Sequence, residues 1–209
     1  MEAYQDPICD HCGVALAIRA FEGSESLRCR DCGEGPYWLD QVRSFGPYIG
    51  ALRVVHHGFK FEGMENLKAA IACKILQGIS SVFWEGVNAV VPVPLSPERE
   101  RERGYNPSNL LAEEIAVNTR VPLRGLLQKI RSSVPQMALD REKRLTNPIG
   151  AYVVSGPIAN ISRVVLVDDV FTTGATIEEC AKVLKKSGVD RVAAVVFGRT
   201  PKTSRSTLK

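Results

Sequence analysis

The 209-residue sequence predicts an α/β fold, in which a parallel β-sheet is flanked by helices and preceded by a small cysteine-rich segment. Short apolar runs alternate with amphipathic stretches, as strands and helices alternate in parallel sheets. Two Cys-x-x-Cys pairs lie within residues 1–40. The apolar run at 164–167 leads directly into a polar loop and a helix, the arrangement that places ligands at the carboxyl ends of parallel strands. We expect a ribbon over 1–40, an α/β domain over 41–199 and a flexible basic tail over 200–209.

The composition fits a globular protein that does not insert into a membrane. Hydrophobic residues make up 44% of the chain, and no apolar run approaches the roughly 20 residues of a membrane span. The first residues have neither a basic segment nor an apolar run, so we expect no signal peptide and a cytoplasmic protein. The net charge is +4, and residues 199–209 contain four basic residues and no acid: Arg199, Lys202, Arg205 and Lys209. A basic, Ser/Thr-rich end is typically solvated, which predicts the flexible tail.

The paired cysteines have the spacing of a zinc ribbon, in which two turns supply four thiolates to one Zn²⁺. The predicted ligands are Cys9, Cys12, Cys29 and Cys32. Four protein ligands leave no open position for catalysis, so the zinc is expected to be structural. Two disulfides are the alternative, and they fit poorly with a cytoplasmic protein. We expect His11, inside the first pair, to be exposed.

The region after the ribbon is predicted to contain a linker and then a helix. Residues 36–47 have the composition of a linker, and a later helix carries Met64, Leu67, Ile71 and Ile75 as an apolar stripe. Cys73 and Cys180 fall on apolar helix faces and are expected in the core. Lys60 is either an anion ligand or a surface lysine, with nothing to separate the two. The neighbouring histidines, His56 and His57, are assigned no catalytic role.

A second strand is predicted at 88–94, followed by a basic loop and a helix that starts at Asn106 and Pro107. The loop contains Arg99, Arg101 and Arg103. Arginines suit a pyrophosphate because they offer paired donors to paired oxygens. The alternative is a solvated loop, because glutamates alternate with the arginines; it is stronger for Arg101 than for Arg103. Further along the chain we expect strands at 126–130, 150–154 and 191–197 and a short helix at 136–147.

The stretch 164–176 carries the strongest chemical pattern of the chain. After four aliphatic residues, Asp168 and Asp169 stand where the buried strand should end. A loop then leads into an amphipathic helix, and its residues are Thr172, Thr173, Gly174, Ala175 and Thr176. Backbone amides, hydroxyls and a helix start together favour a phosphate. The carboxylates suit hydroxyl groups or Mg²⁺, so the stretch predicts binding of a ribose 5-phosphate.

This stretch resembles the phosphoribosyl-pyrophosphate (PRPP) motif of type I phosphoribosyltransferases. Other segments narrow the resemblance to the ComF family: Phe-Lys-Phe-x-Gly at 59–63, Pro-Val-Pro at 92–94, Arg-Gly-Tyr-Asn at 103–106 and Gly-Ala-Tyr at 150–152. The resemblance implies the type I phosphoribosyltransferase fold, with Asp168 and Asp169 on the ribose hydroxyls and the loop 172–176 on the 5-phosphate. The family usually has Gln at the position of Pro107 in this chain.

Two functions follow from the resemblance. The first is a Mg²⁺-dependent phosphoribosyltransferase, whose pyrophosphate would lie near Arg99, Arg103 and Lys60. Its catalytic groups, Asp168 and Asp169, would stabilise the positive charge that develops at C1 of the ribose. The second is an accessory protein of natural transformation that handles single-stranded DNA beside a competence helicase and binds PRPP with little turnover. A PRPP-responsive regulator is a further, weaker interpretation. No residues diagnostic of the acceptor or of the oligomeric state are evident.

Overall fold

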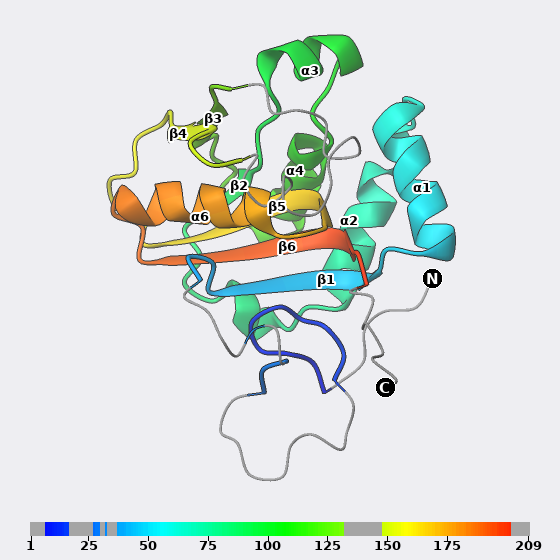
Figure 1. Cartoon of the computed structure of the whole chain (residues 1–209), viewed down its shortest axis with the longest axis horizontal. Helices are drawn as coiled ribbons and strands as arrows, with labels where there is room; N and C mark the ends of the chain where they lie inside the picture. Colours follow the sequence, from blue (N-terminus) through cyan, green and yellow to red (C-terminus); the bar gives the residue numbers. More distant parts are fainter. Residues whose placement is uncertain (1–6, 17–26, 30–31, 33–36, 132–147, 202–209) are drawn as a thin grey trace, which may run out of the picture.

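The protein is built on a four-stranded, all-parallel sheet with the strand order β1-β6-β5-β2 (Figure 1). The computed structural model describes residues 7–16, 27–29, 32, 37–131 and 148–201. The strands are β1 (Gln41–Pro47), β6 (Arg191–Arg199), β5 (Arg163–Phe171) and β2 (Ala89–Pro92). Three of them, β2, β5 and β6, lie where apolar runs predicted strands. No helix in the described ranges has the length and apolar character that crossing a membrane requires.

The central strand β5 continues beyond the point where the sequence predicted its end. Residues 164–167 are fully buried between β2 and β6, as their aliphatic run predicted. Pairing with β2 stops at Val167, whereas pairing with β6 continues to Phe171. Asp168 and Asp169 therefore belong to the strand and lie at an edge that β2 has left open.

Three helices cover one face of the sheet (Figure 1). They are α1 (Gly50–Phe61), α2 (Lys68–Gln77) and α4 (Pro107–Thr119), and two 3₁₀ turns, η3 (Glu65–Leu67) and η4 (Ser81–Trp84), adjoin α2. Leu111 and Ile115 of α4 pack in this core. Asn106 caps α4 by accepting a hydrogen bond from the amide of Ser108 at 3.1 Å, and Pro107 is the first helical residue.

The opposite face is covered by α6 (Ala175–Lys186) and by a two-stranded antiparallel hairpin. The hairpin strands are β3 (Leu127–Lys129) and β4 (Tyr152–Val154). Buried residues of α6 form the predicted apolar stripe: Ile177, Cys180, Ala181 and Leu184. The cysteine segment packs into the same core and lies beside β1 in Figure 1.

Two predictions of secondary structure were wrong. Residues 41–47 form β1 rather than a linker; only Val42, Phe45 and Gly46 are buried in this strand, so its sequence lacks an apolar run. Arg99, Arg101 and Arg103 lie on a short helix, α3 (Pro97–Arg103), rather than in a loop. This helix has no buried residue and is bounded by capping residues. At its start the Ser96 hydroxyl accepts from the amide of Arg99, and at its end Gly104 has a positive φ.

Several side-chain predictions were wrong as well. Cys73 is exposed, whereas Cys180 is buried as expected. Met64 lies before η3 and is 46% exposed, so it takes no part in the helix stripe. Arg199, counted among the charges of the tail, is buried at the end of β6. The helix predicted at 136–147 lies outside the described residues, as does the tail beyond residue 201.

Candidate functional site

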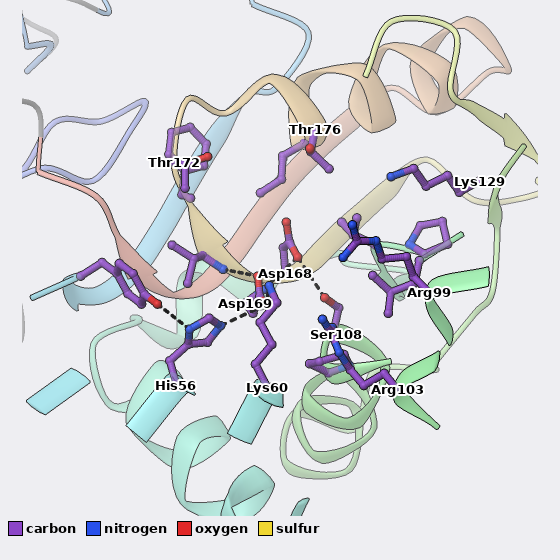
Figure 2. A pocket seen from close by; sticks show the side chains of 18 of the residues that line it. His56, Lys60, Arg99, Arg103, Ser108, Lys129, Asp168, Asp169, Thr172 and Thr176 are labelled. Carbon is purple, nitrogen blue, oxygen red and sulfur yellow. Dashed lines mark hydrogen bonds and ion pairs between the residues drawn. The ribbon is translucent and has the colours of Figure 1, made fainter. Parts of the chain in front are cut away.

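A cleft of about 690 Å³ opens beyond the carboxyl ends of β2 and β5. Its walls come from α1, the segment between β2 and α4, the β3–β4 hairpin and the residues after β5. Figure 2 shows the two aspartates in the centre, Thr172 and Thr176 on one side, and Arg99 and Lys129 on another. The position agrees with the rule that parallel sheets bind ligands at the carboxyl ends of their strands.

Asp169 is held ionised by two hydrogen-bond donors of α1, Lys60 and His56. Lys60 Nζ donates to Asp169 Oδ2, and His56 Nε2 lies 3.0 Å from the same oxygen (Figure 2). An ionised carboxylate only accepts, so Nε2 carries a proton and donates, and the Tyr48 hydroxyl lies 2.7 Å from His56 Nδ1 on the other side of the ring. Burial acts to raise the pKa of Asp169, but the Lys60 charge and the bonds from His56 and Lys60 outweigh it and lower the pKa.

Asp168 has a different environment from its neighbour. The Ser108 hydroxyl donates to Asp168 Oδ1 at 2.9 Å. Burial raises the pKa of Asp168 to about 7, and the negative charge of Asp169 adds to the increase. The pair therefore combines one carboxylate with a strong preference for the charged form and one that can change protonation near neutral pH.

The residues after β5 form a tight turn that we call the threonine loop (residues 172–176). Gly174 has φ +84°, and a Cβ at this position would lie 2.5 Å from Cζ of Phe171, so the turn requires glycine. The amide of Ala175, the first residue of α6, donates to Thr173 Oγ1 at 3.4 Å. Thr172, Gly174 and Thr176 line the cleft, whereas Thr173 and Ala175 shape the turn.

Basic side chains outnumber acidic ones among the described residues that line the cleft. The acidic residues are the two aspartates, and the lysines and arginines are five: Arg53, Lys60, Arg99, Arg103 and Lys129. Arg103 Cζ lies 5.2 Å from the centroid of the Phe61 ring, and its Nη1 is buried with no hydrogen-bond partner in the described part of the chain. Burial lowers the pKa of Arg103. Because Arg103 lines the cleft, its guanidinium is a suitable donor for an anion bound there.

The structure brings together the basic residues singled out from the sequence, with one exception. Lys60, Arg99 and Arg103 line the same cleft as the aspartates. Arg101 is exposed, and its Nε donates to the carbonyl of Pro97, in keeping with the solvated alternative.

Sequence reasoning missed several other polar residues of the site. They include Tyr48, Arg53, His56, Ser108, Lys129 and Tyr152. The spacing of Arg53, His56 and Lys60 at i, i+3 and i+7 puts them on one side of α1 and was an available signal. Lys129 had none, because it meets Tyr152 across the β3–β4 hairpin, with Lys129 Nζ 5.5 Å from the Tyr152 ring centroid.

The cysteine cluster (Cys9, Cys12, Cys29 and Cys32) has the geometry of a metal site. All four sulfurs lie within 4.8 Å of one another, and Cys12 Sγ lies 3.6 Å from Cys29 Sγ. Tetrahedral zinc with Zn–S bonds of about 2.3 Å would separate the sulfurs by about 3.8 Å. The amides of Cys12 and Cys29 lie 3.5 and 3.3 Å from Cys9 Sγ, where they stabilise a thiolate. The cluster can therefore hold a metal ion.

The prediction that His11 is exposed was wrong. Its ring is 6% exposed, lies 4.3 Å from the Tyr37 ring and has Nδ1 3.1 Å from the carbonyl oxygen of Asp40. The ring is buried because the first cysteine turn packs against the start of β1.

Comparison with known proteins agrees with the fold. Residues 103–206 match the family model described as the phosphoribosyl transferase domain. The chain is 30% identical to competence protein F of Haemophilus influenzae over 194 residues, which is 89% of this chain and 82% of that protein. It is 30% identical to competence protein ComFC of Bacillus subtilis over 187 residues (87% and 72%) and 28% identical to DNA utilization protein YhgH of Salmonella typhimurium over 198 residues (92% and 84%).

The sheet, the cleft and the matched domain define a protein of the type I phosphoribosyltransferase class. Within this class, the similarity to competence protein F and ComFC extends over most of each chain. The chain belongs to the ComF family, and the resemblance found in the sequence is confirmed.

Proposed function

We propose that the protein binds PRPP in the cleft and acts in the uptake and use of DNA. One observation carries the proposal: the paired aspartates and the threonine loop converge at the carboxyl end of β5, inside the segment that matches the phosphoribosyl transferase domain. The names of the relatives, two competence proteins and a DNA utilization protein, supply the biological setting.

Each part of PRPP has a chemically suitable partner in the cleft. The threonine loop and the first amides of α6 would hold the 5-phosphate, since hydroxyls and helix-start amides favour anions. Asp169, kept ionised by His56 and Lys60, and Asp168 would accept hydrogen bonds from the ribose hydroxyls. Arg99 and Arg103 would take the pyrophosphate, and the unpaired Nη1 of Arg103 would gain a partner.

Transferase chemistry would depend on electrostatics and positioning. As pyrophosphate leaves, positive charge grows at C1 of the ribose, and the two carboxylates are placed to stabilise it. The arginines would stabilise the negative charge that builds on the leaving group. A Mg²⁺ ion bound with PRPP would neutralise pyrophosphate charge, and the carboxylates are the oxygen ligands that this ion prefers.

We further propose that the metal of the cysteine cluster is zinc with a structural role. Four clustered sulfur ligands favour zinc and would leave no coordination position for a substrate.

Calorimetric titration with PRPP and Mg²⁺ tests the proposed ligand. We expect binding by the protein and a loss of at least about 100-fold in affinity for the double variant Asp168→Asn/Asp169→Asn, because several hydrogen bonds to charged groups of about 1.5–3 kcal/mol each disappear. Arg101→Gln, on the solvated side of α3, is the matched control and should bind like the unaltered protein. Equal affinities for all three proteins would place PRPP elsewhere.

A second candidate function is direct binding of single-stranded DNA, beside a helicase partner, and the excess of basic residues around the cleft favours it. Competition separates the two roles. If DNA occupies the same basic residues, PRPP should displace a fluorescent oligonucleotide, and the arginine variants of the cleft should weaken both ligands.

A further inference from the structure

The side chain of Arg199 joins the cysteine cluster to the cleft. Arg199 is the last residue of β6 and is only 3% exposed, so its charge needs partners within the protein. Its Nη1 donates to the backbone carbonyl of Cys12. Its Cζ lies 5.1 Å from the centroid of the Phe171 ring, a cation–π distance. One guanidinium thus contacts both a cysteine turn and the end of β5.

The Phe171 ring in turn sets the position of the threonine loop. The ring lies so close to Gly174 that a single methyl group on that residue would overlap it. The amide of Thr200 donates to the carbonyl of Phe171 at 2.9 Å, which fixes the backbone of Phe171 to the residue after Arg199. Since both Gly174 of the loop and the guanidinium of Arg199 contact this ring, a displacement of Arg199 would change the position of the ring against the loop.

We propose that Arg199 is a positioning residue that couples metal occupancy of the cysteine cluster to ligand binding by the threonine loop. The coupling rests on the proposed function for the identity of the loop's ligand. A bound metal fixes the Cys12 turn and its carbonyl, the carbonyl orients the guanidinium, and the guanidinium holds the ring against the loop. Thermodynamic linkage then requires that PRPP and the metal strengthen each other's binding by the same factor.

Metal affinity measured with and without PRPP tests the coupling. In the unaltered protein, competition with a zinc chelator should show an affinity about 10-fold higher when PRPP and Mg²⁺ are present. In Arg199→Met this ratio should fall to about 1, because the hydrogen bond to Cys12 is lost while an apolar contact with Phe171 remains. Arg163→Met is the matched control: Arg163 also donates to backbone carbonyls, those of Glu85 and Phe83, at the opposite end of β5, and its variant should keep the ratio.

Hydrogen exchange without any ligand gives a readout that does not depend on PRPP. Removing the metal should speed exchange of the amides at 172–176 by about 10-fold in the unaltered protein, while the amides at 164–167 stay protected. Arg199→Met should show the fast loop exchange with the metal still bound. If the metal affects the loop equally in Arg199→Met and in the unaltered protein, the coupling is wrong.

The two proposals can fail separately. Absence of PRPP binding by the metal-loaded protein would overturn the proposed ligand, and loop exchange would still decide the coupling. If Arg199→Met does not fold, Phe171→Leu replaces it, since it removes the ring contact and keeps the bond to Cys12. If hydrogen exchange of the loop in that variant still depends on the metal, the proposed coupling through the guanidinium and the ring is wrong.

Discussion

Asp168 and Asp169 are neighbours whose pKa values shift in opposite directions, and the difference comes from the side chains around them. Asp169 accepts from Lys60 and His56, whereas Asp168 accepts from a neutral hydroxyl. The pKa shifts have opposite signs for this reason. The aspartates themselves could be predicted from the sequence, because their spacing to the threonine loop is distinctive. Their separate roles could not, because His56 and Asp169 lie 113 residues apart.

Removing His56 should cost stability as well as ligand affinity. Because the pKa of Asp169 is lowered, its charged form stabilises the fold above the unfolded pKa near 4, and this stabilisation is lost as the pH falls. His56→Ala removes a donor from that buried carboxylate and should lower the free energy of unfolding at pH 7 by about 2 kcal/mol, as measured in urea. His57→Ala is the control, since its side chain is 60% exposed, and should change it by less than about 0.5 kcal/mol. A similar loss of unfolding free energy in both variants would argue against a stabilising bond from His56 to Asp169.

The secondary structure elements that the sequence predicted best are those with buried, apolar side chains. β2, β5 and β6 are buried strands and have apolar sequences, and α6 has a regular apolar stripe. The missed elements have other causes of stability. β1 alternates polar residues with Val42 and Phe45, and α3 depends on its caps because none of its residues is buried. Composition therefore located the core and gave little information about the walls of the cleft.

The start of α6 offers a test of the threonine loop as one unit. Gly174→Ala introduces both a strained φ of +84° and a collision with the Phe171 ring, so we expect unfolding to become about 1–3 kcal/mol easier and PRPP affinity to fall at least about 10-fold. Gly188→Ala, just after the other end of α6, has φ +104° and no atom near the added methyl.

Gly188→Ala should therefore lower stability while leaving PRPP affinity unchanged. Calorimetry and urea unfolding of both variants separate the two effects. Normal affinity in Gly174→Ala would show that the loop can move away from the ring without loss of its ligand.

At the level of the whole molecule, the described part of the cysteine segment (residues 7–16, 27–29 and 32) packs against the α/β domain. Cys9, Cys12 and Cys32 pack in the same core as α6. The amide of Val42 donates to the carbonyl of His11, and Arg43 donates to that of Asp10. The four ligands could be predicted from their spacing alone, but these contacts with β1 could not, because β1 itself was mistaken for a linker.

Loss of one cysteine ligand should therefore affect more than metal content. Cys29→Ser should lose the single expected zinc and destabilise the described residues around it, 7–16 and 27–29, because metal binding and local folding are one process. Metal analysis and limited proteolysis would detect both changes. Cys73→Ser, at an exposed position on α2, should keep its zinc and its resistance to proteolysis. A fully stable protein without any metal would refute the zinc site.

The contact between His11 and Val42 has a consequence for the solubility of the protein. β1 is the outer strand of the sheet, and its free side would present amide groups that can pair with a strand of another molecule. The first cysteine turn shields that side, just as residues 122–124 shield β2 through hydrogen bonds with Val90. If the cluster holds the proposed zinc, loss of the metal would leave β1 unprotected, and we would then expect aggregation as well as loss of function.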